Sequence, residues 1–291
     1  MLPSARLAVA AAAFGALGAV PIVPSAVAGP DSAVPSFDRY VALGDSYASG
    51  PGLAPPADQL CERSQRNYGH LVAAALSVRE YVDATCGGAV TANLSTSQKP
   101  GVPPQQSVLT ADTDLVTITI GGNDAGFVEV MSTCGVLGVA PVVPDPCRAH
   151  YTRTGTDELA RRLDEVVAPG LRAAFAEIRA RAPHATIVAT TYPRLVPDSG
   201  QCWPAVPFAA GDLPYLDALH RGLNDTIAAE AAKAGVAVAD VFGPSAGHDA
   251  CQPADIRWTE PLIGATDAAA HPNRTGMEQT AQAVLAAIDG A

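Results

Sequence analysis

A serine follows directly after a short apolar run near the start of the chain. The run is Tyr40-Val41-Ala42-Leu43, and Gly44-Asp45-Ser46-Tyr47 comes next. A hydroxyl at the carboxyl end of a buried strand lies where α/β enzymes carry out their chemistry. Most serines are surface residues or helix caps, so Ser46 becomes a candidate nucleophile only if further reactive groups lie with it.

Two glycine-rich motifs follow the next two apolar runs. They are Cys86-Gly87-Gly88-Ala89 and Gly121-Gly122-Asn123-Asp124. Glycine lets a backbone N–H approach a ligand closely, and an Asn amide is a fixed neutral donor. Such donors stabilise the oxyanion that forms in acyl transfer. Taken singly, Gly-Gly is more often a turn and Asn-Asp a helix cap, and neither stretch has the spacing of a phosphate-binding loop.

One of six histidines is a candidate general base. His271 lies in Ala270-His271-Pro272-Asn273, between the last strand expected and a C-terminal helix, from where it can reach the same sheet edge as Ser46. The other five are expected to be surface or packing residues. These are His70, His150, His184, His220 and His248.

Short apolar runs alternate with longer amphipathic stretches after residue 36. The runs lack polar alternation, which is typical of strands covered on both faces: 39–43, 81–84, 115–120, 186–190 and 236–240. Helices are expected at 68–77, 125–132, 156–181, 215–234 and 274–288, with a kink or break at Pro169-Gly170 in the third. Strands separated by helices predict a mainly parallel five-stranded sheet in a three-layer α/β/α domain.

Four Pro/Gly-rich segments are expected to be loops around the site: 50–62, 96–106, 134–147 and 197–213. Together with residues 251–270, several of them could form an apolar acyl groove. Its candidate walls are Trp203, Phe208 and Trp258, which could equally pack beneath the long loops.

The N-terminus has the pattern of an export signal. A short basic start is followed by an apolar, alanine-rich run and by Ala26-Val27-Ala28, an A-x-A cleavage site. We therefore expect a signal peptide over residues 1–28, a single catalytic domain over 29–291 and an extracellular protein; a retained N-terminal anchor is the alternative. The chain has 29 acidic and 18 basic residues, which argues against nucleic acid and anionic membranes as partners.

Six cysteines in an exported chain suggest three disulfides. Their spacing favours sequential closure: Cys61–Cys86, Cys134–Cys147 and Cys202–Cys251. The middle pair is expected to bracket a loop with little secondary structure. Zinc is the competing interpretation, but the chain has no C-x-x-C pair.

Taken together, the motifs resemble those of the SGNH, or GDSL-type, hydrolase family. The matching blocks are Gly44-Asp45-Ser46, Gly88, Gly121-Gly122-Asn123-Asp124 and His271-Pro272-Asn273, in order over nearly the whole mature chain. The composition looks like that of the secreted actinobacterial lipase and esterase branch. The resemblance implies a flavodoxin-like sheet, Ser46 as nucleophile and His271 as base. It also implies an oxyanion hole made by the Ser46 N–H, the Gly88 N–H and the Asn123 side chain.

The chain departs from the family pattern at one position. The family's histidine block has a carboxylate three residues before the base, where this chain has Ala268; the nearest acid is Asp267. Asp267 could still reach His271 and complete a triad. Alternatively a backbone carbonyl, that of Ala268, accepts the Nδ1 proton and leaves a Ser-His dyad. We favour the dyad. Asp45 is expected to be a structural hydrogen-bonding residue.

The function expected is hydrolysis of a carboxylic ester through an acyl-serine, with no metal or organic cofactor. Lipid esters, phospholipids and small soluble esters all fit, and polysaccharide deacetylation is a close alternative. A non-catalytic secreted binding protein is the rival from another class. We expect a monomer without a nucleic-acid partner and without stable insertion into a membrane.

Overall fold

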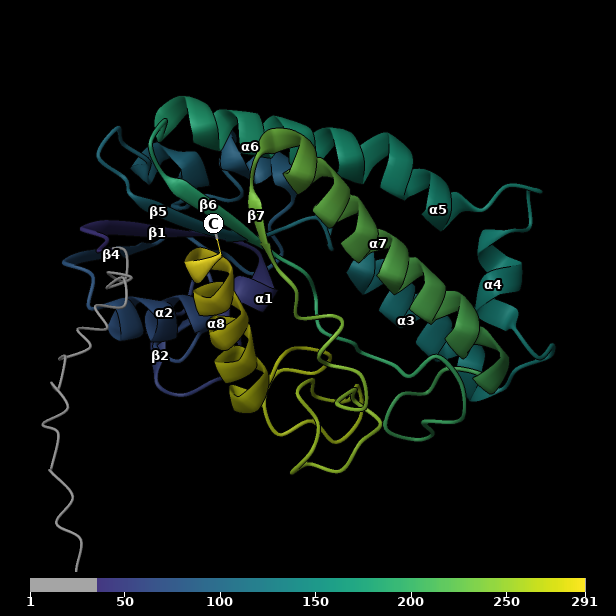
Figure 1. The fold of residues 1–291 in the computed structure, drawn as a ribbon. Coiled ribbons are helices and arrows are strands. Elements are labelled where there is room, and N and C mark those ends of the chain that lie inside the picture. Colours follow the sequence, from purple (N-terminus) through teal and green to yellow (C-terminus); the bar gives the residue numbers. More distant parts are fainter. Residues whose placement is uncertain (1–35, 291) are drawn as a thin grey trace, which may run out of the picture. The chain divides into compact units, whose positions relative to one another are not determined.

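The core of the protein is a sheet of five parallel strands. The computed structural model describes residues 36–290; the expected signal peptide and the start of the expected domain lie outside them. The strand order is β4-β1-β5-β6-β7, which is the flavodoxin-like order (Figure 1). The strands span Arg39–Gly44 (β1), Glu80–Asp83 (β4), Leu115–Thr119 (β5), Thr186–Thr190 (β6) and Ala237–Ala239 (β7). The predicted five-stranded parallel sheet is confirmed.

Helices cover both faces of the sheet, as Figure 1 shows. Alternate residues of β1 enter different cores: Val41 and Leu43 lie with the side chains of α6 and α7, whereas Tyr40 and Ala42 lie with those of α2 and α8. A strand buried on both faces cannot alternate apolar and polar residues, which explains the continuous apolar runs. These helices span Tyr68–Leu76 (α2), Ala168–Arg181 (α6), Leu213–Ala234 (α7) and Arg274–Asp289 (α8).

The long helix predicted over 156–181 has three parts. It runs through α5 (Glu158–Arg162), a π-helical segment η3 (Leu163–Val167) and α6. Pro169 has no N–H to donate to the preceding turn, and in a regular α-helix its ring would clash with the carbonyl four residues earlier. The predicted irregularity is therefore present, as a widened turn just before the proline.

The expected loop at 134–147 is a loop only over residues 140–145; its two ends are helical, and there the expectation was wrong. α3 (Phe127–Val139) starts later and ends later than predicted, and α4 (Pro146–Tyr151) is an additional helix. Cys134 and Cys147 are both buried and join these two helices through a disulfide. The Pro-rich residues that link the two helices form a loop, as their composition indicates, while the residues around each cysteine are helical.

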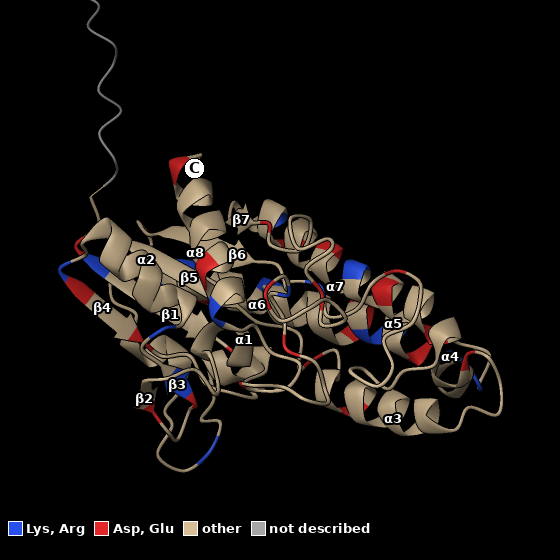
Figure 2. Cartoon of the chain, turned by 90° about the horizontal axis from the view of Figure 1, so that it is seen from below, with Lys and Arg blue, Asp and Glu red and all other residues tan. Residues whose placement is uncertain are grey.

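The remaining elements are short. They are α1 (Ser46–Ser49), β2 (Pro56–Asp58), β3 (Arg63–Ser64), η1 (Thr91–Leu94), η2 (Gln105–Val108) and η4 (Ala210–Asp212). The other disulfides join Cys61 to Cys86 and Cys202 to Cys251, which is sequential pairing. Lys and Arg are spread among Asp and Glu in Figure 2, and pairs such as Arg162–Glu158 and Arg221–Asp217 join them on α5 and α7.

Two glycines of α3 provide a matched test of how this helix packs. A Cβ at Gly138 would overlap the Pro207 carbonyl oxygen, whereas a Cβ at Gly135 would lie 3.8 Å from Pro207 Cγ, an ordinary contact. We expect Gly138→Ala to cost about 1–3 kcal/mol of unfolding free energy. Gly135→Ala should be neutral or stabilise by up to about 1 kcal/mol, because alanine favours the helix. Denaturant unfolding with disulfides intact measures both; equal effects would contradict this packing.

Candidate active site

Ser46 begins the short helix α1 where β1 ends. The side chain of Asp45 caps this helix by accepting a hydrogen bond of 2.9 Å from the Tyr47 N–H. Gly44 has φ +133° and lies so close to Thr119 that a Cβ would overlap its carbonyl oxygen. The glycine thus allows the chain to turn sharply out of the sheet, with Ser46 8% exposed at its carboxyl edge.

His271 is held by a short antiparallel contact with residues 258–260. The Glu260 N–H donates to the His271 carbonyl at 2.9 Å, and the Ala270 N–H donates to the Glu260 carbonyl at 3.1 Å. The Asn273 side chain caps α8 by accepting a hydrogen bond from the Gly276 N–H. The backbone N–H of Asn273 donates to the Trp258 carbonyl. The backbone on both sides of His271 is therefore fixed.

The structure brings Ser46 and His271 into hydrogen-bond contact. His271 Nε2 lies 2.7 Å from Ser46 Oγ, and Nδ1 lies 2.7 Å from the Ala269 carbonyl oxygen. A carbonyl only accepts, so Nδ1 carries the proton and Nε2 is free to accept the serine proton. This is the geometry of a nucleophile and its base.

The group that orients His271 is neither of the two expected from sequence. The Ala268 carbonyl accepts the backbone N–H of His271 at 3.2 Å, which closes a tight turn. Ala270, which lies in the same turn, has φ +59°. Within this turn the Ala269 carbonyl faces the ring instead of the Ala268 carbonyl or the Asp267 carboxylate. The backbone alternative was thus right in kind but placed one residue too early.

Burial lowers the pKa of His271 below the ordinary histidine value, against the opposing effects of the Ala269 carbonyl and the Glu62 carboxylate. An imidazolium in this position would lose more hydration than these groups return. The neutral imidazole is therefore the stable form at neutral pH.

Tyr47 connects the serine helix to the histidine turn, which the sequence did not indicate. Its hydroxyl donates to the Ala270 carbonyl at 2.6 Å. Its ring lies beside that of His271, with 5.2 Å between centroids. The residue after Ser46 thus holds the residue before His271.

Asp45 is buried and joins two of the sequence motifs. It accepts a hydrogen bond from the Tyr192 hydroxyl, which itself accepts from the Gly122 N–H at 2.9 Å. Burial raises the pKa of Asp45 to about 7, although the hydrogen bonds from Tyr192 and Tyr47 oppose this shift. Asp45 has the structural role expected of it, and Tyr192 is an additional partner with no motif to reveal it.

The two expected oxyanion groups beyond Ser46 lie together. The Asn123 amide donates to the Ala89 carbonyl at 2.9 Å, next to Gly88, which has φ +78°. An amide nitrogen has two N–H donors, so one remains for a ligand. Among residues 36–290 the N–H groups of Ser46 and Gly88 have no hydrogen-bond partner. Asp124 binds the Thr91 hydroxyl and N–H instead of capping α3.

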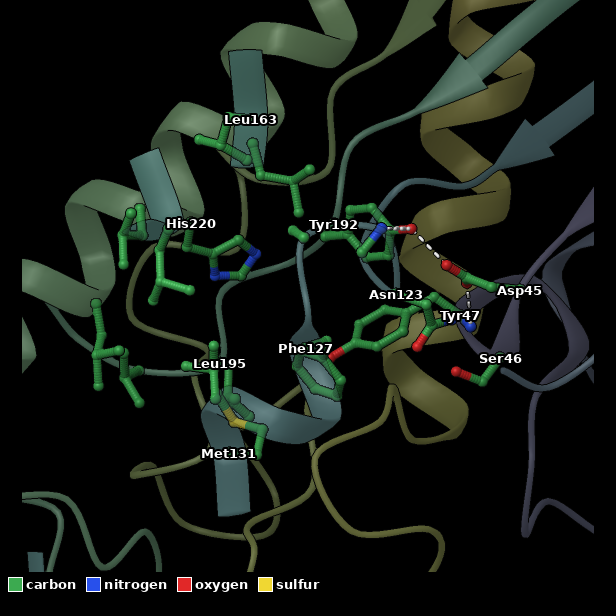
Figure 3. Close-up of a pocket in the computed structure, with 18 of the residues that line it drawn as sticks. Asp45, Ser46, Tyr47, Asn123, Phe127, Met131, Leu163, Tyr192, Leu195 and His220 are labelled. Carbon is green, nitrogen blue, oxygen red and sulfur yellow. Dashed lines mark hydrogen bonds between the residues drawn. The ribbon is translucent and has the colours of Figure 1, made fainter. Parts of the chain in front are cut away.

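An apolar cavity extends from Ser46 between α3, α5, η3 and α7 (Figure 3). Phe208 lines it as expected, but Trp203 and Trp258 do not. Trp203 is half exposed, and Trp258 is buried and stacked on His248. The expected groove between loops is thus mostly a space between helices.

Within the described residues, no cluster of three or more His, Cys, Asp or Glu side chains could hold a metal ion. No helix within this part of the chain combines the length and apolarity needed to cross a membrane.

A flavodoxin-like three-layer fold with a Ser-His pair at the carboxyl edge of its sheet defines a hydrolase of the SGNH type. The chain belongs to the GDSL-like Lipase/Acylhydrolase family, whose model matches residues 42–279. It is a carboxylic ester hydrolase of the lipase and esterase group.

Known proteins similar to this chain include "Lipase 2" of Streptomyces coelicolor, 42% identical over 89% of this chain and 88% of the relative. Two solved structures share the fold with a TM-score of 0.72: phospholipase A1 from Streptomyces albidoflavus NA297, 28% identical, and an extracellular lipase from Streptomyces rimosus, 29% identical. Each alignment covers 86% of this chain and 99% of the other.

The contact with Ala269 predicts that Asp267 is dispensable for catalysis. We expect Asp267→Ala to keep ester hydrolysis within a few-fold of wild type, because no carboxylate orients the imidazole. Steady-state kcat/KM on a soluble ester is the measurement. A loss near the ~10⁴-fold that follows disabling the acid of a Ser-His-Asp triad would contradict this arrangement.

The burial of the His271 imidazole predicts that the acid limb of the pH–activity profile lies at low pH. Protonated His271 cannot accept the serine proton, so activity falls as the pH drops through the pKa of His271. Because burial lowers that pKa, the midpoint should lie below the ordinary ~6.5. The kcat/KM measured from about pH 4 to 9 tests this; a flat profile, or a midpoint well above ~6.5, would exclude a buried histidine base.

Proposed function

We propose that Ser46 and His271 carry out the ester hydrolysis as a catalytic dyad. The observation that supports this most is the 2.7 Å contact between Ser46 Oγ and His271 Nε2. Ser46 Oγ attacks the ester carbonyl carbon while Nε2 takes its proton. Collapse of the tetrahedral intermediate breaks the bond to the alcohol, which His271 protonates. Water then repeats the sequence on the acyl-serine and releases the acid.

The oxyanion that forms in each half-reaction would be bound by the N–H groups of Ser46 and Gly88 and by the Asn123 amide. The Ser46 N–H follows the end of β1, the Gly88 N–H lies in a turn after β4, and the Asn123 amide is held through the Ala89 carbonyl. Preorganised donors of this kind are the main source of rate enhancement in acyl transfer.

The orienting group for His271 would be a neutral carbonyl. The Ala269 carbonyl holds the Nδ1 proton and so selects the tautomer that leaves Nε2 free. It stabilises the imidazolium of the transition state less than a carboxylate would. The oxyanion donors must therefore contribute more of the catalysis.

We further propose that the protein is extracellular, as a monomer of residues 29–291 released from a signal peptide over 1–28, with an ester substrate and no nucleic-acid partner. The three disulfides support an oxidising compartment. The similar lipase of Streptomyces rimosus is also described as extracellular.

The decisive test compares Ser46→Ala with Ser49→Ala. Both serines lie on α1, but the Ser49 hydroxyl is buried without a hydrogen-bond partner among residues 36–290. We expect Ser46→Ala to lose on the order of 10⁶-fold in kcat on p-nitrophenyl esters, as in other serine hydrolases, whereas Ser49→Ala retains wild-type activity. Turnover by Ser46→Ala at the wild-type rate would refute the dyad. A lack of serine-dependent turnover on every ester would favour a binding protein.

A further inference from the structure

One tyrosine hydroxyl connects the loops that follow three neighbouring strands. β5 lies between β1 and β6 in the sheet, and Asp45 follows β1, Gly122 follows β5 and Tyr192 follows β6. The Tyr192 hydroxyl accepts a hydrogen bond from the Gly122 N–H at 2.9 Å and donates to the Asp45 carboxylate. Dashed lines in Figure 3 connect Tyr192 to Asp45 and Asp45 to Tyr47. The Tyr192 side chain therefore spans the end of β5.

The two residues that the Tyr192 hydroxyl joins directly precede two groups of the proposed machinery. Gly122 precedes Asn123, and Asp45 precedes Ser46. Among residues 36–290 the Tyr192 hydroxyl is the only hydrogen-bond partner of the Gly122 N–H. Without it, a buried N–H would lose its partner, which is costly enough to shift the loop that carries Asn123.

Tyr192 is itself held from the side of α7. It is 4% exposed, and its backbone N–H and carbonyl both bond to the Asn224 side chain, at 2.8 and 3.2 Å. Its ring lies edge-on to that of Tyr47, with 5.0 Å between centroids. A Cβ at Gly122 would lie 3.1 Å from the Tyr192 hydroxyl, so only a glycine lets the phenol lie this close to the backbone before Asn123. The hydroxyl is thus placed by α7 and by packing, and the loop conforms to it.

We propose that Tyr192 is a positioning residue that holds the Asn123 amide at the separation from Ser46 at which it binds the oxyanion. This inference rests on the proposed oxyanion hole. The Tyr192 hydroxyl bonds to neither Ser46 nor His271, and it acts through the Gly122 N–H. An oxyanion donor is effective because it is aimed at the developing charge beforehand, so a shift of its loop weakens catalysis without removing the donor.

The test is a double-mutant cycle of Tyr192→Phe with Asn123→Ala, measured on a soluble p-nitrophenyl ester. Phenylalanine keeps the ring and removes only the hydroxyl. We expect Asn123→Ala to lower kcat by on the order of 10²–10³ and Tyr192→Phe to lower it by about tenfold. For Tyr192→Phe, kcat and kcat/KM should fall by the same factor, because the weakened interaction is made only in the transition state. In the Asn123→Ala background, Tyr192→Phe should lower kcat by less than about twofold, since no amide is left to misplace.

The matched control is Tyr40→Phe, which removes another buried tyrosine hydroxyl. That hydroxyl lies 2.6 Å from Thr117 Oγ1, on the side of the sheet that α2 and α8 cover. Urea unfolding with disulfides intact should show both Tyr→Phe variants destabilised, whereas only Tyr192→Phe should lose kcat. Gly122→Ala replaces Tyr192→Phe if that variant fails to fold, because its Cβ pushes the phenol away from the same N–H.

Two results would overturn the inference while leaving the Ser46 dyad intact. One is wild-type kcat in the folded Tyr192→Phe variant. The other is an equal loss from Tyr192→Phe with and without the Asn123 amide, which would show that the hydroxyl supports the site only in a general structural way. Wild-type kcat in Asn123→Ala would instead overturn the proposed oxyanion role of Asn123, and the positioning role of Tyr192 with it.

Discussion

The hydrogen bond between Ser46 and His271 joins residues 225 positions apart, and much of the fold serves to place its two ends. Ser46 is fixed from the sheet side, because Gly44 turns the chain out of β1 and the Asp45 side chain caps α1. His271 is fixed from the opposite side by its antiparallel contact with Glu260. Tyr47 then joins the two parts through the Ala270 carbonyl. A displacement of either part would separate Ser46 Oγ from His271 Nε2.

The carbonyl of Ala269 changes the electrostatics of this site. A carboxylate beside Nδ1 would raise the pKa of His271, whereas here burial dominates and lowers it. The imidazole therefore stays neutral at lower pH. A neutral carbonyl would also stabilise an imidazolium at this position less than a carboxylate would. Asp45, the buried acid beside Ser46, accepts a hydrogen bond from the Tyr192 hydroxyl and takes no part in orienting His271.

The cavity depends on the same helices that cover one face of the sheet. α7 and η3 pack on the sheet through residues such as Ile227 and Val167, while Leu163 and Leu223 also face the cavity. The π-helical turn before Pro169 lies at this wall. The core and the walls of this cavity are thus built from one set of apolar side chains, and for this reason the apolar pattern alone cannot separate them.

The sequence alone determined the sheet, the outer helices and the four motif blocks. Strands buried on both faces leave continuous apolar runs, and glycine, serine and asparagine after such runs reflect what backbone and chemistry require locally. Tertiary structure decided the rest. Tyr47 and Tyr192 act through hydrogen bonds to distant partners, and neither residue type has a spacing that reveals this. The extension of α3 to Val139 and the added helix α4 go with the packing between these two helices and the disulfide that joins them. The group that orients His271 is a main-chain carbonyl, which every residue carries, so only the turn made by residues 268–271 could select Ala269.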